Sequence, residues 1–516
     1  MSSPASVPRL HTRLFNRWLD FIERAGNRLP DPLFLFFLMA VLVPVASWIA
    51  VSVHWTLPHP VSGEIIEPVN LLTRDNLQRM FTEAVENFTS FPPLGVVLVA
   101  MIGIGVAERS GLIATLLKWF VTAVPGGILT AALVLAGVMS NVAADAGYVV
   151  LTPLGAVLFA SVGRHPVAGL CAAFAGVSGG FSANLVINAL DPLLAGFTDA
   201  AAKLYDPTYQ VVATANYYFM VASTFLIVAA GWWVTEKIVE PRLGPWKPDQ
   251  ALEPPDTQST RLTERERTAA LAAIGAGLLT LIACGLLSFP NGALLRDEAG
   301  GLAPFYESLI PLIAIVFVIP GLVYGLILGN IRTTGDVARM MGDTMATMGG
   351  YIVLAFMAAQ FVTYFRWSNL GLMFALAGAD FLKGIGVGAI PLLLGIIVLS
   401  AVINFFIGSA SAKWALMAPV VVPMLMSLGF SPEMAQAAYR IGDSITNIIT
   451  PLLPYFPIIL AFARKYDRNI RLGTLISSML PYSIAFGVVW SVQLVVWYLL
   501  DLPLGPGAPI HLPLPE

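Results

Sequence analysis

Charged residues are scarce in this sequence. Asp, Glu, Lys and Arg make up 11% of its 516 residues, whereas 57% are hydrophobic. A soluble globular protein carries roughly 25% charged residues, so this chain lacks the polar surface needed to cover itself in water. The scarcity excludes an ordinary soluble fold. The formal net charge of −3 gives no indication of a nucleic-acid partner.

Cysteine and histidine are also scarce. The two cysteines, Cys171 and Cys284, both lie inside apolar runs, where we expect buried small side chains rather than a disulfide framework. The sequence contains no H-E-x-x-H and no G-x-x-x-x-G-K-[ST]. Neither a zinc protease nor an ATP-driven pump is therefore indicated, and we expect no cofactor.

Long apolar runs dominate what is present. Stretches such as residues 33–53 are apolar on every face, which favours membrane-spanning helices over barrel strands, since barrel strands alternate apolar and polar residues. The fold class predicted is an all-α polytopic membrane protein. The candidate spans are 33–54, 93–108, 126–140, 166–190, 213–234, 268–290, 306–329, 347–365, 387–403, 432–463 and 471–500.

Most of the few charged residues lie outside the apolar runs and so divide the chain into segments. Residues 1–31 form a predicted amphipathic segment on the cytoplasmic surface, and 235–267 form a Pro-rich basic linker between a first membrane half, 32–234, and a second, 268–500. The tail, 501–516, has no Lys or Arg. By the positive-inside rule we expect the N-terminus and the linker in the cytoplasm and the tail in the periplasm.

The two halves share an interruption by polar residues and proline. Pro153 and Pro166 are 13 residues apart, as are Pro419 and Pro432. Gly176 and Ser178 then follow Pro166 at the offsets at which Gly442 and Ser444 follow Pro432, although chance can place a few such matches. Interrupted segments at corresponding positions point to a transport site at the membrane midplane. We predict an inverted repeat, with re-entrant hairpins near 142–163 and 405–428, each followed by a broken helix.

Two charges lie close together in the second broken helix. Arg440, Asp443 and Asn447 share one helical face, and charges at this depth are costly without a use or a partner. One interpretation is a structural ion pair between Arg440 and Asp443. In the functional interpretation, Arg440 binds the substrate anion, and Asp443 binds the coupling cation with the help of Asn447.

Asp191 directly precedes Pro192. Proline disfavours helical geometry in the residue before it, so this carboxylate should stand beside freed carbonyl groups, where it can bind Na⁺ or carry a proton. The alternative is a helix-end carboxylate in contact with water.

Further polar residues gather at the hairpins. Asn404, Ser411 and Trp414 lie in the second, and Asn141 lies in the analogous stretch of the first. These side chains could bind substrate or ion, but Ser411 and Asn404 could also only cap the turn, and Trp414 could only pack. Lys413 could extend to an interface.

A second class of function also has a sequence signal. Residues 176–180 (GVSGG) match the G-x-S-x-G pattern of serine hydrolases, with Ser178 as nucleophile. The pentapeptide is weak in a chain with 45 glycines and five histidines, and an intramembrane hydrolase stays an alternative only.

Longer motifs carry a more specific resemblance. Residues 23–30 (ERAGNRLP), 91–95 (FPPLG), 103–111 (GIGVAERSG), 404–419 and 439–451 resemble the AbgT family of p-aminobenzoyl-glutamate transporters. The resemblance runs from about residue 14 to 500. It implies an inner-membrane homodimer whose protomer has about nine membrane helices and two opposed hairpins.

The resemblance also implies a function. Family members are associated with uptake of p-aminobenzoyl-glutamate and with export of sulfonamides, coupled to Na⁺ or H⁺. A Na⁺-coupled dicarboxylate or citrate carrier is the runner-up, because such carriers also pair two hairpins. The family's functional positions are matched by Asp191, Asn404, Ser411, Trp414, Arg440 and Asp443.

Overall fold

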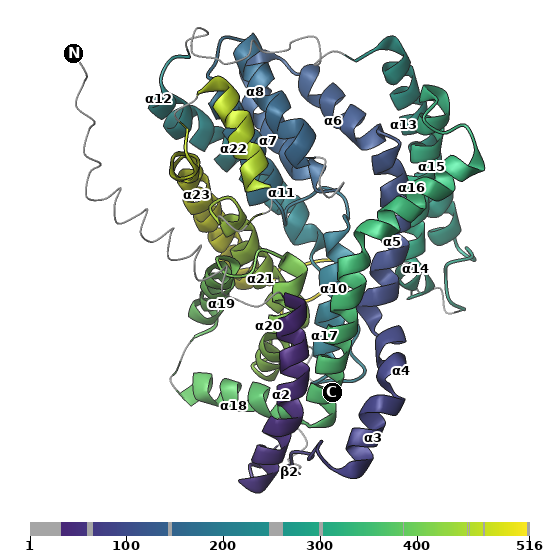
Figure 1. The fold of residues 1–516 in the computed structure, drawn as a ribbon, viewed down its shortest axis with the longest axis vertical. Coiled ribbons are helices and arrows are strands. Elements are labelled where there is room, and N and C mark those ends of the chain that lie inside the picture. The colour runs from purple at the N-terminus through teal and green to yellow at the C-terminus, as the bar shows by residue number, and fades with distance from the viewer. Residues whose placement is uncertain are drawn as a thin grey trace, which may run out of the picture.

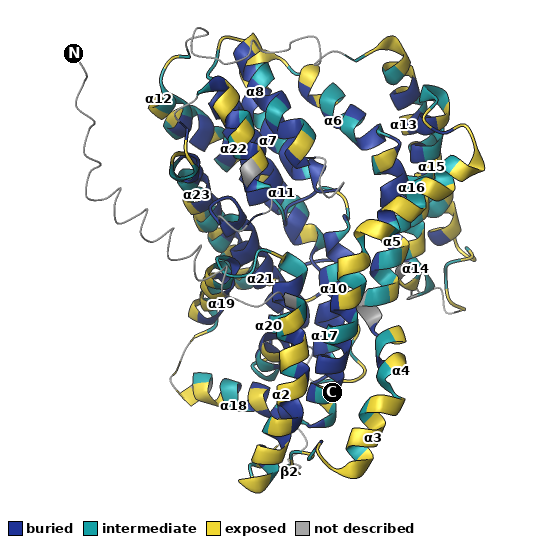
Figure 2. Cartoon of the chain, in the orientation of Figure 1, coloured by how far each residue is buried: buried dark blue, intermediate teal, exposed yellow. Residues whose placement is uncertain are grey.

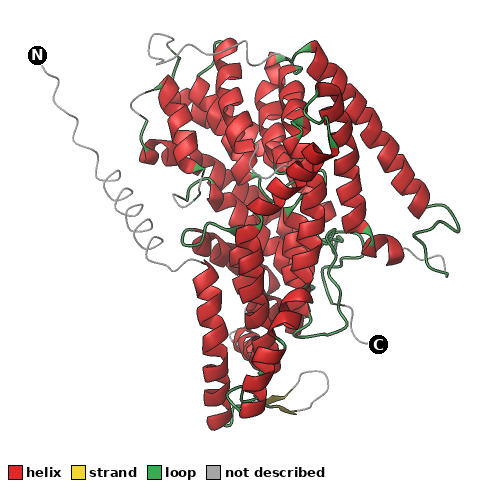
Figure 3. Cartoon of the chain, turned by 45° about the vertical axis from the view of Figure 1, so that its right-hand side comes forward, coloured by secondary structure: helices red, strands yellow, loops and turns green. Residues whose placement is uncertain are grey.

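The computed structural model describes residues 32–58, 65–142, 147–246, 262–298, 303–384, 386, 388–450, 453, 455–467 and 470–512. The predicted N-terminal segment 1–31 and residues 247–261 of the Pro-rich linker lie outside them. Nearly all described elements are helices, and the named strands are one short antiparallel pair, β1 (Leu57–Pro58) and β2 (Ile65–Ile66) (Figure 3). The predicted all-α class is confirmed.

The first group of helices comprises those of the first half and the two short ones that begin the linker. They are α2 (Pro32–Ser52), α3 (Arg74–Thr82), α4 (Ala84–Thr89), α5 (Pro92–Arg109), α6 (Leu112–Thr122), η1 (Gly126–Ile128), α7 (Leu129–Ser140), η2 (Gly147–Leu151), α8 (Thr152–Ser161), α9 (Pro166–Phe174), η3 (Ala175–Gly179), α10 (Leu190–Ala202), α11 (Tyr217–Val234), η4 (Thr235–Val239) and α12 (Glu240–Leu243).

The second half follows in the same way. Its helices are α13 (Glu264–Ser288), α14 (Ala303–Glu307), α15 (Leu309–Leu328), α16 (Thr334–Thr347), α17 (Gly349–Trp367), α18 (Leu370–Gly384), α19 (Ala389–Asn404), α20 (Ala410–Ser427), α21 (Pro432–Asn447), α22 (Phe456–Tyr466) and α23 (Leu472–Leu499).

The outer helices expose apolar side chains. On α13, Leu278, Leu279 and Leu286 are each more than half exposed, and α13 lies at one edge of the molecule, where Figure 2 shows exposed residues (Figures 1 and 2). Such surfaces are stable only against lipid or another protein. Six described helices are long and apolar enough to cross a membrane, and two bent helix pairs add to them. The figure of about nine spans stays a prediction.

The predicted hairpins consist of longer arms than expected. Residues 147–161 are a single helical arm, η2 and α8, and its partner arm is α7, across a break after Asn141. In the second half, α19 and α20 are the two arms around residues 405–409. Ser409 begins α20, because its side chain accepts a hydrogen bond from the backbone N–H of Ala412. Each predicted segment thus covers a turn and one arm.

The two candidate spans that follow the hairpins are broken, as predicted. The run 166–190 is helical only to Gly179 and resumes with α10 at Leu190. The run 432–463, taken as one span, contains two helices, because α21 ends at Asn447 and α22 begins at Phe456. Polar residues lie at both breaks, and prolines lie in or just after them. Each run is predicted as one candidate span when only its overall apolar length is considered.

The internal repeat has a physical basis in close helix packing. A Cβ atom added to Gly176 would lie 2.4 Å from the carbonyl oxygen of Val134, and one added to Gly442 would lie 2.2 Å from that of Ile397. Val134 and Ile397 each precede an asparagine, Asn141 and Asn404, by seven residues. In each half, the matched glycine therefore lets two helices of that half touch backbone to backbone.

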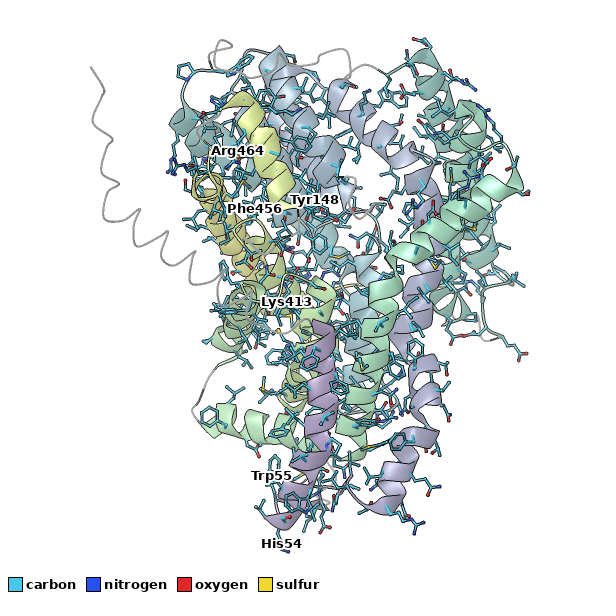
Figure 4. The ribbon with its side chains drawn as sticks, in the orientation of Figure 1. His54, Trp55, Tyr148, Lys413, Phe456 and Arg464 are labelled. Atoms are coloured by element: carbon cyan, nitrogen blue, oxygen red, sulfur yellow. The ribbon has the colours of Figure 1, made fainter. Side chains whose placement is uncertain are left out.

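Helix α11 extends into the predicted linker. It continues through η4 and α12 to Leu243, and Glu236 and Glu240 pair with Arg164, which follows α8. In Figure 4, Arg464 lies at the same end of the molecule as α12, whereas His54 and Trp55 mark the opposite end (Figure 4). The basic segments near α12 and Arg464 therefore share one end, as the positive-inside rule requires.

Candidate functional site

One buried face of α21 carries a stripe of polar side chains. Glu433, Gln436, Arg440, Asp443 and Asn447 recur at intervals of three and four residues, which places them on one side of a helix. None is more than 5% exposed. Ser431 caps the helix and Pro432 occupies its first turn, which fixes where the stripe begins. The sequence reading found the last three of these residues and missed the first two.

Arg440 is paired with Asp191 from the first half of the chain. Its Nη2 donates to Asp191 Oδ1 over 2.6 Å, and the backbone N–H of Asn188 donates to the other carboxylate oxygen over 2.8 Å. Asp191 is fully buried at the start of α10, so it stands at a helix break, as predicted, but not in contact with water. Among the described residues, Arg440 Nε has no hydrogen-bond partner.

Asp443 is paired with Lys413. The ammonium of Lys413 contacts Asp443 Oδ1 and Asn404 Oδ1, and the lysine is 0% exposed. The interpretation of Lys413 as an interfacial lysine is wrong, and so is the structural pair between Arg440 and Asp443. Arg440 and Asp443 instead each meet an opposite charge from another helix. A count of two buried acids against one buried cation could have flagged the lysine.

Asn404 is held in one orientation. Its Nδ2 donates to the backbone carbonyl of Asp443, to Thr446 Oγ1 and to Asn447 Oδ1, each over 2.8 Å. These bonds turn Asn404 Oδ1 toward Lys413. Asn447 Nδ2 in turn donates to the second oxygen of Asp443 over 3.4 Å. Asn404, Asp443 and Asn447, predicted together as ion-binding residues, are thus one hydrogen-bonded cluster.

Trp414 lies behind this cluster and is 0% exposed. Its Nε1 donates to Thr198 Oγ1 over 2.8 Å, and Thr198 donates to Gln436 over 2.6 Å. The indole stacks on Tyr439 with ring centroids 4.5 Å apart. Trp414 therefore connects α20 with α10 and α21, and it does not line the cavity described next.

A cavity of about 360 Å³ borders the charged cluster. Three predicted residues, Asn141, Ser411 and Asn447, supply polar groups to its wall, and Asn141 Oδ1 has no hydrogen-bond partner among the described residues. The wall consists of Val97, Met101, Asn141, Tyr148, Phe181, Ala189, Leu190, Leu193, Met348, Tyr351, Gly408, Ala410, Ser411, Asn447, Leu453 and Tyr455.

Aromatic rings form much of the apolar wall, and the sequence reading missed them. Tyr148 and Tyr455 stack almost in parallel, with centroids 4.1 Å apart and planes 8° apart. They come from the first hairpin and from the break after α21. Figure 4 shows Tyr148 between Lys413 and the end of the molecule that carries Arg464 (Figure 4). Tyr148 lies at the start of η2, and Tyr455 lies between α21 and α22. Neither falls in the interior of a long helix, where periodicity would mark it.

A second cavity of about 350 Å³ lies between α13, α15 and residues 186–187. Apart from Tyr217 and Cys284, its lining side chains are hydrocarbon. Ligand sites combine an apolar wall with a few convergent polar groups, so the cavity beside Asn141, Ser411 and Asn447 is the better candidate.

Among the described residues, Ser178 has no histidine in reach. Its hydroxyl is buried and has no hydrogen-bond partner among the described residues. His165 caps the opposite end of α9. The two residues are 13 positions apart in sequence, which at a rise of 1.5 Å per residue separates them by roughly 20 Å. In the part of the chain that the structure describes, no base therefore stands beside Ser178 as it does beside the nucleophile of a serine protease.

Buried charge pairs beside a mid-molecule cavity, held by two interrupted helix repeats, define a multi-helix membrane transporter rather than an enzyme. The sequence model of the AbgT putative transporter family matches residues 17–512. The chain belongs to this family.

Similar proteins agree with that assignment. The chain is 37% identical to the p-aminobenzoyl-glutamate transport protein of Escherichia coli K12, over 94% of this chain and 96% of that protein. The Alcanivorax borkumensis YdaH transporter is 45% identical with a TM-score of 0.86, over 92% of this chain and 100% of that one.

Neisseria gonorrhoeae MtrF, described as illuminating a class of antimetabolite efflux pumps, is 46% identical with a TM-score of 0.91, over 96% and 100% of the two chains. These relatives are transporters and pumps, so the hydrolase alternative is rejected and the resemblance to the AbgT family is confirmed.

Proposed function

We propose that this protein is a cation-coupled secondary transporter that moves p-aminobenzoyl-glutamate or related aryl anions across the bacterial inner membrane. The observation on which this proposal rests is the cavity of about 360 Å³ beside the buried charge pairs. Ligand pockets are typically about 300–1,000 Å³ and mostly apolar with a few placed polar groups. The name of the Escherichia coli relative supports the substrate, and the description of MtrF supports outward movement of antimetabolites, for which the sequence resemblance suggests sulfonamides.

The cavity suits a ligand with an aryl ring and a carboxylate. Tyr148, Phe181 and Tyr455 supply ring faces. The buried Arg440, whose Nε has no hydrogen-bond partner among the described residues, lies on the same helix as Asn447 of the cavity wall. A dicarboxylate would leave these rings unused. The role first assigned to Trp414, stacking on the aryl group, passes in this proposal to the tyrosines, and Trp414 holds the helices behind them.

The coupling cation binds in this proposal at Asp443 and Asn404, with Asn447 in support. Carboxylate and amide oxygens suit a hard cation such as Na⁺, and the two Oδ1 atoms converge on one point, the ammonium of Lys413. Asp191 and Asn141 belong to the opposite repeat, where a proton or a second ion would bind. The protein works as a homodimer, with the N-terminus and linker in the cytoplasm.

Competitive uptake tests the substrate class. In proteoliposomes, uptake of radiolabelled p-aminobenzoyl-glutamate should saturate and should be unaffected by excess succinate. Replacing Tyr148 by leucine removes the stacked pair, so the KM should rise about three- to tenfold, while Tyr218→Leu, at an exposed position, should leave the KM unchanged. Inhibition by succinate, with an unchanged KM in Tyr148→Leu, would favour the dicarboxylate carrier.

A further inference from the structure

Lys413 occupies the position that a coupling cation would take. Its ammonium contacts only two side-chain oxygens among the contacts described, Asn404 Oδ1 and Asp443 Oδ1. One is an amide oxygen and the other a carboxylate oxygen, which are the ligand types that hard cations prefer. The lysine is 0% exposed and sits in the first turn of α20, near the middle of the long axis (Figure 4).

The surroundings of the ammonium are built to present these oxygens. Three hydrogen bonds from Asn404 Nδ2 fix the direction of its Oδ1, and Asn447 holds the other oxygen of Asp443. These three bonds do not depend on the lysine, because Asn404 Nδ2 makes all of them to acceptors on α21. The cluster would therefore keep its shape if a different cation replaced the ammonium.

The charges near Lys413 are balanced as they stand. Lys413 neutralises Asp443 and Arg440 neutralises Asp191. A second cation at Asp443 would place two positive charges on one carboxylate in a poorly screened interior, where like charges repel strongly. The lysine ammonium and the coupling cation therefore exclude each other.

The cavity lies close enough to Lys413 to receive its ammonium group. Gly408, just before α20, and Ala410 and Ser411, in its first turn, line the cavity. Lys413 lies in the same first turn. A lysine carries its charge on a flexible four-carbon stem, so a change of rotamer can turn the ammonium toward the cavity. There it would meet the carboxylate of an anionic substrate.

We propose that Lys413 is a tethered cation that holds the Asp443–Asn404 position in the ion-free state. Binding of the coupling cation displaces its ammonium toward the cavity, which links cation binding to binding of the anion. The inference rests on the proposed function for its cation site, but it concerns how that site is kept closed, and it commits to Na⁺ as the ion to be tested.

Binding of Na⁺ to the purified full-length protein tests the inference. The thermal unfolding midpoint would be followed against NaCl, with choline chloride keeping the ionic strength constant. Lys413→Met removes the competing charge, so its stabilisation by Na⁺ should be half-complete at a concentration at least about tenfold lower than in the wild type. Asp443→Asn should show no Na⁺ effect. Lys203→Met, which removes a partly exposed lysine from its pair with Asp199, should behave as the wild type.

A second variant guards against poor folding. Lys413→Gln keeps a hydrogen-bonding side chain without the charge, and ²²Na⁺ binding measured directly on it should show the same tighter affinity. An equal or weaker Na⁺ affinity in both variants would overturn the tethered-cation inference. Substrate transport by the wild type under an imposed cation gradient is measured separately, so the proposed function could still stand after that result.

Discussion

Replacing Asp191 by asparagine should abolish transport and lower the stability of the folded protein. Arg440 is 3% exposed, and Asp191 is its charged partner. Removing one member of a buried ion pair leaves the other charge uncompensated and costs about 3–5 kcal/mol. The thermal unfolding midpoint in detergent, read beside uptake in proteoliposomes, measures both effects.

A double variant separates charge balance from function. Asp191→Asn combined with Arg440→Gln removes both charges, so stability should largely return, whereas transport should not. Glu83→Gln breaks the exposed pair with Arg79 and should cost at most about 1 kcal/mol. If Asp191→Asn proves no less stable than Glu83→Gln, the pair does not carry the energetic weight assigned to it here.

Replacing Gly442 by alanine should disrupt the second repeat. The added Cβ would lie 2.2 Å from the carbonyl oxygen of Ile397 and 2.6 Å from the Cβ of Ser400. Neither the helix backbone nor a Cβ can rotate away, so α19 and α21 must separate, which costs about 1–3 kcal/mol or more and displaces Asp443 and Asn404. Thermal stability and monodispersity in detergent report the loss.

The chain offers a matched glycine as control. Gly395 lies on α19, and a Cβ there would have no atom within 4 Å, so Gly395→Ala should be neutral or slightly stabilising, because alanine favours a helix. Gly176→Ala should resemble Gly442→Ala, since its Cβ would approach Val134 in the same way. Equal stability of Gly442→Ala and Gly395→Ala would contradict the packing role of the repeat.

Much of the fold can be predicted from the sequence, because the length of an apolar run and the position of a proline are local properties. The spacing of polar residues and prolines predicts the broken helices. The spacing of glycines predicts the match of Gly176 and Gly442, which make close backbone contacts in the structure. The arms of the hairpins were misplaced, because α7 and α19 are as apolar as a full span and carry no mark of where they turn.

The site was only half predictable. Arg440, Asp443 and Asp191 stand out because charge is rare in apolar runs, but their partners depend on packing between distant helices. Asp191 and Arg440 are 249 positions apart, and no local rule pairs them. Lys413 looked like a residue at an interface for the same reason, and Tyr148 and Tyr455 meet only through the fold.

Gradient-driven accumulation of radiolabelled p-aminobenzoyl-glutamate in proteoliposomes tests the central claim most directly. Wild type and Asp443→Asn would be compared under an imposed Na⁺ gradient and then under a proton gradient. We predict accumulation above equilibrium by the wild type under a cation gradient, and none by Asp443→Asn. Accumulation by the variant at the wild-type level, or none by correctly inserted wild type under either gradient, would contradict a cation-coupled carrier for this substrate.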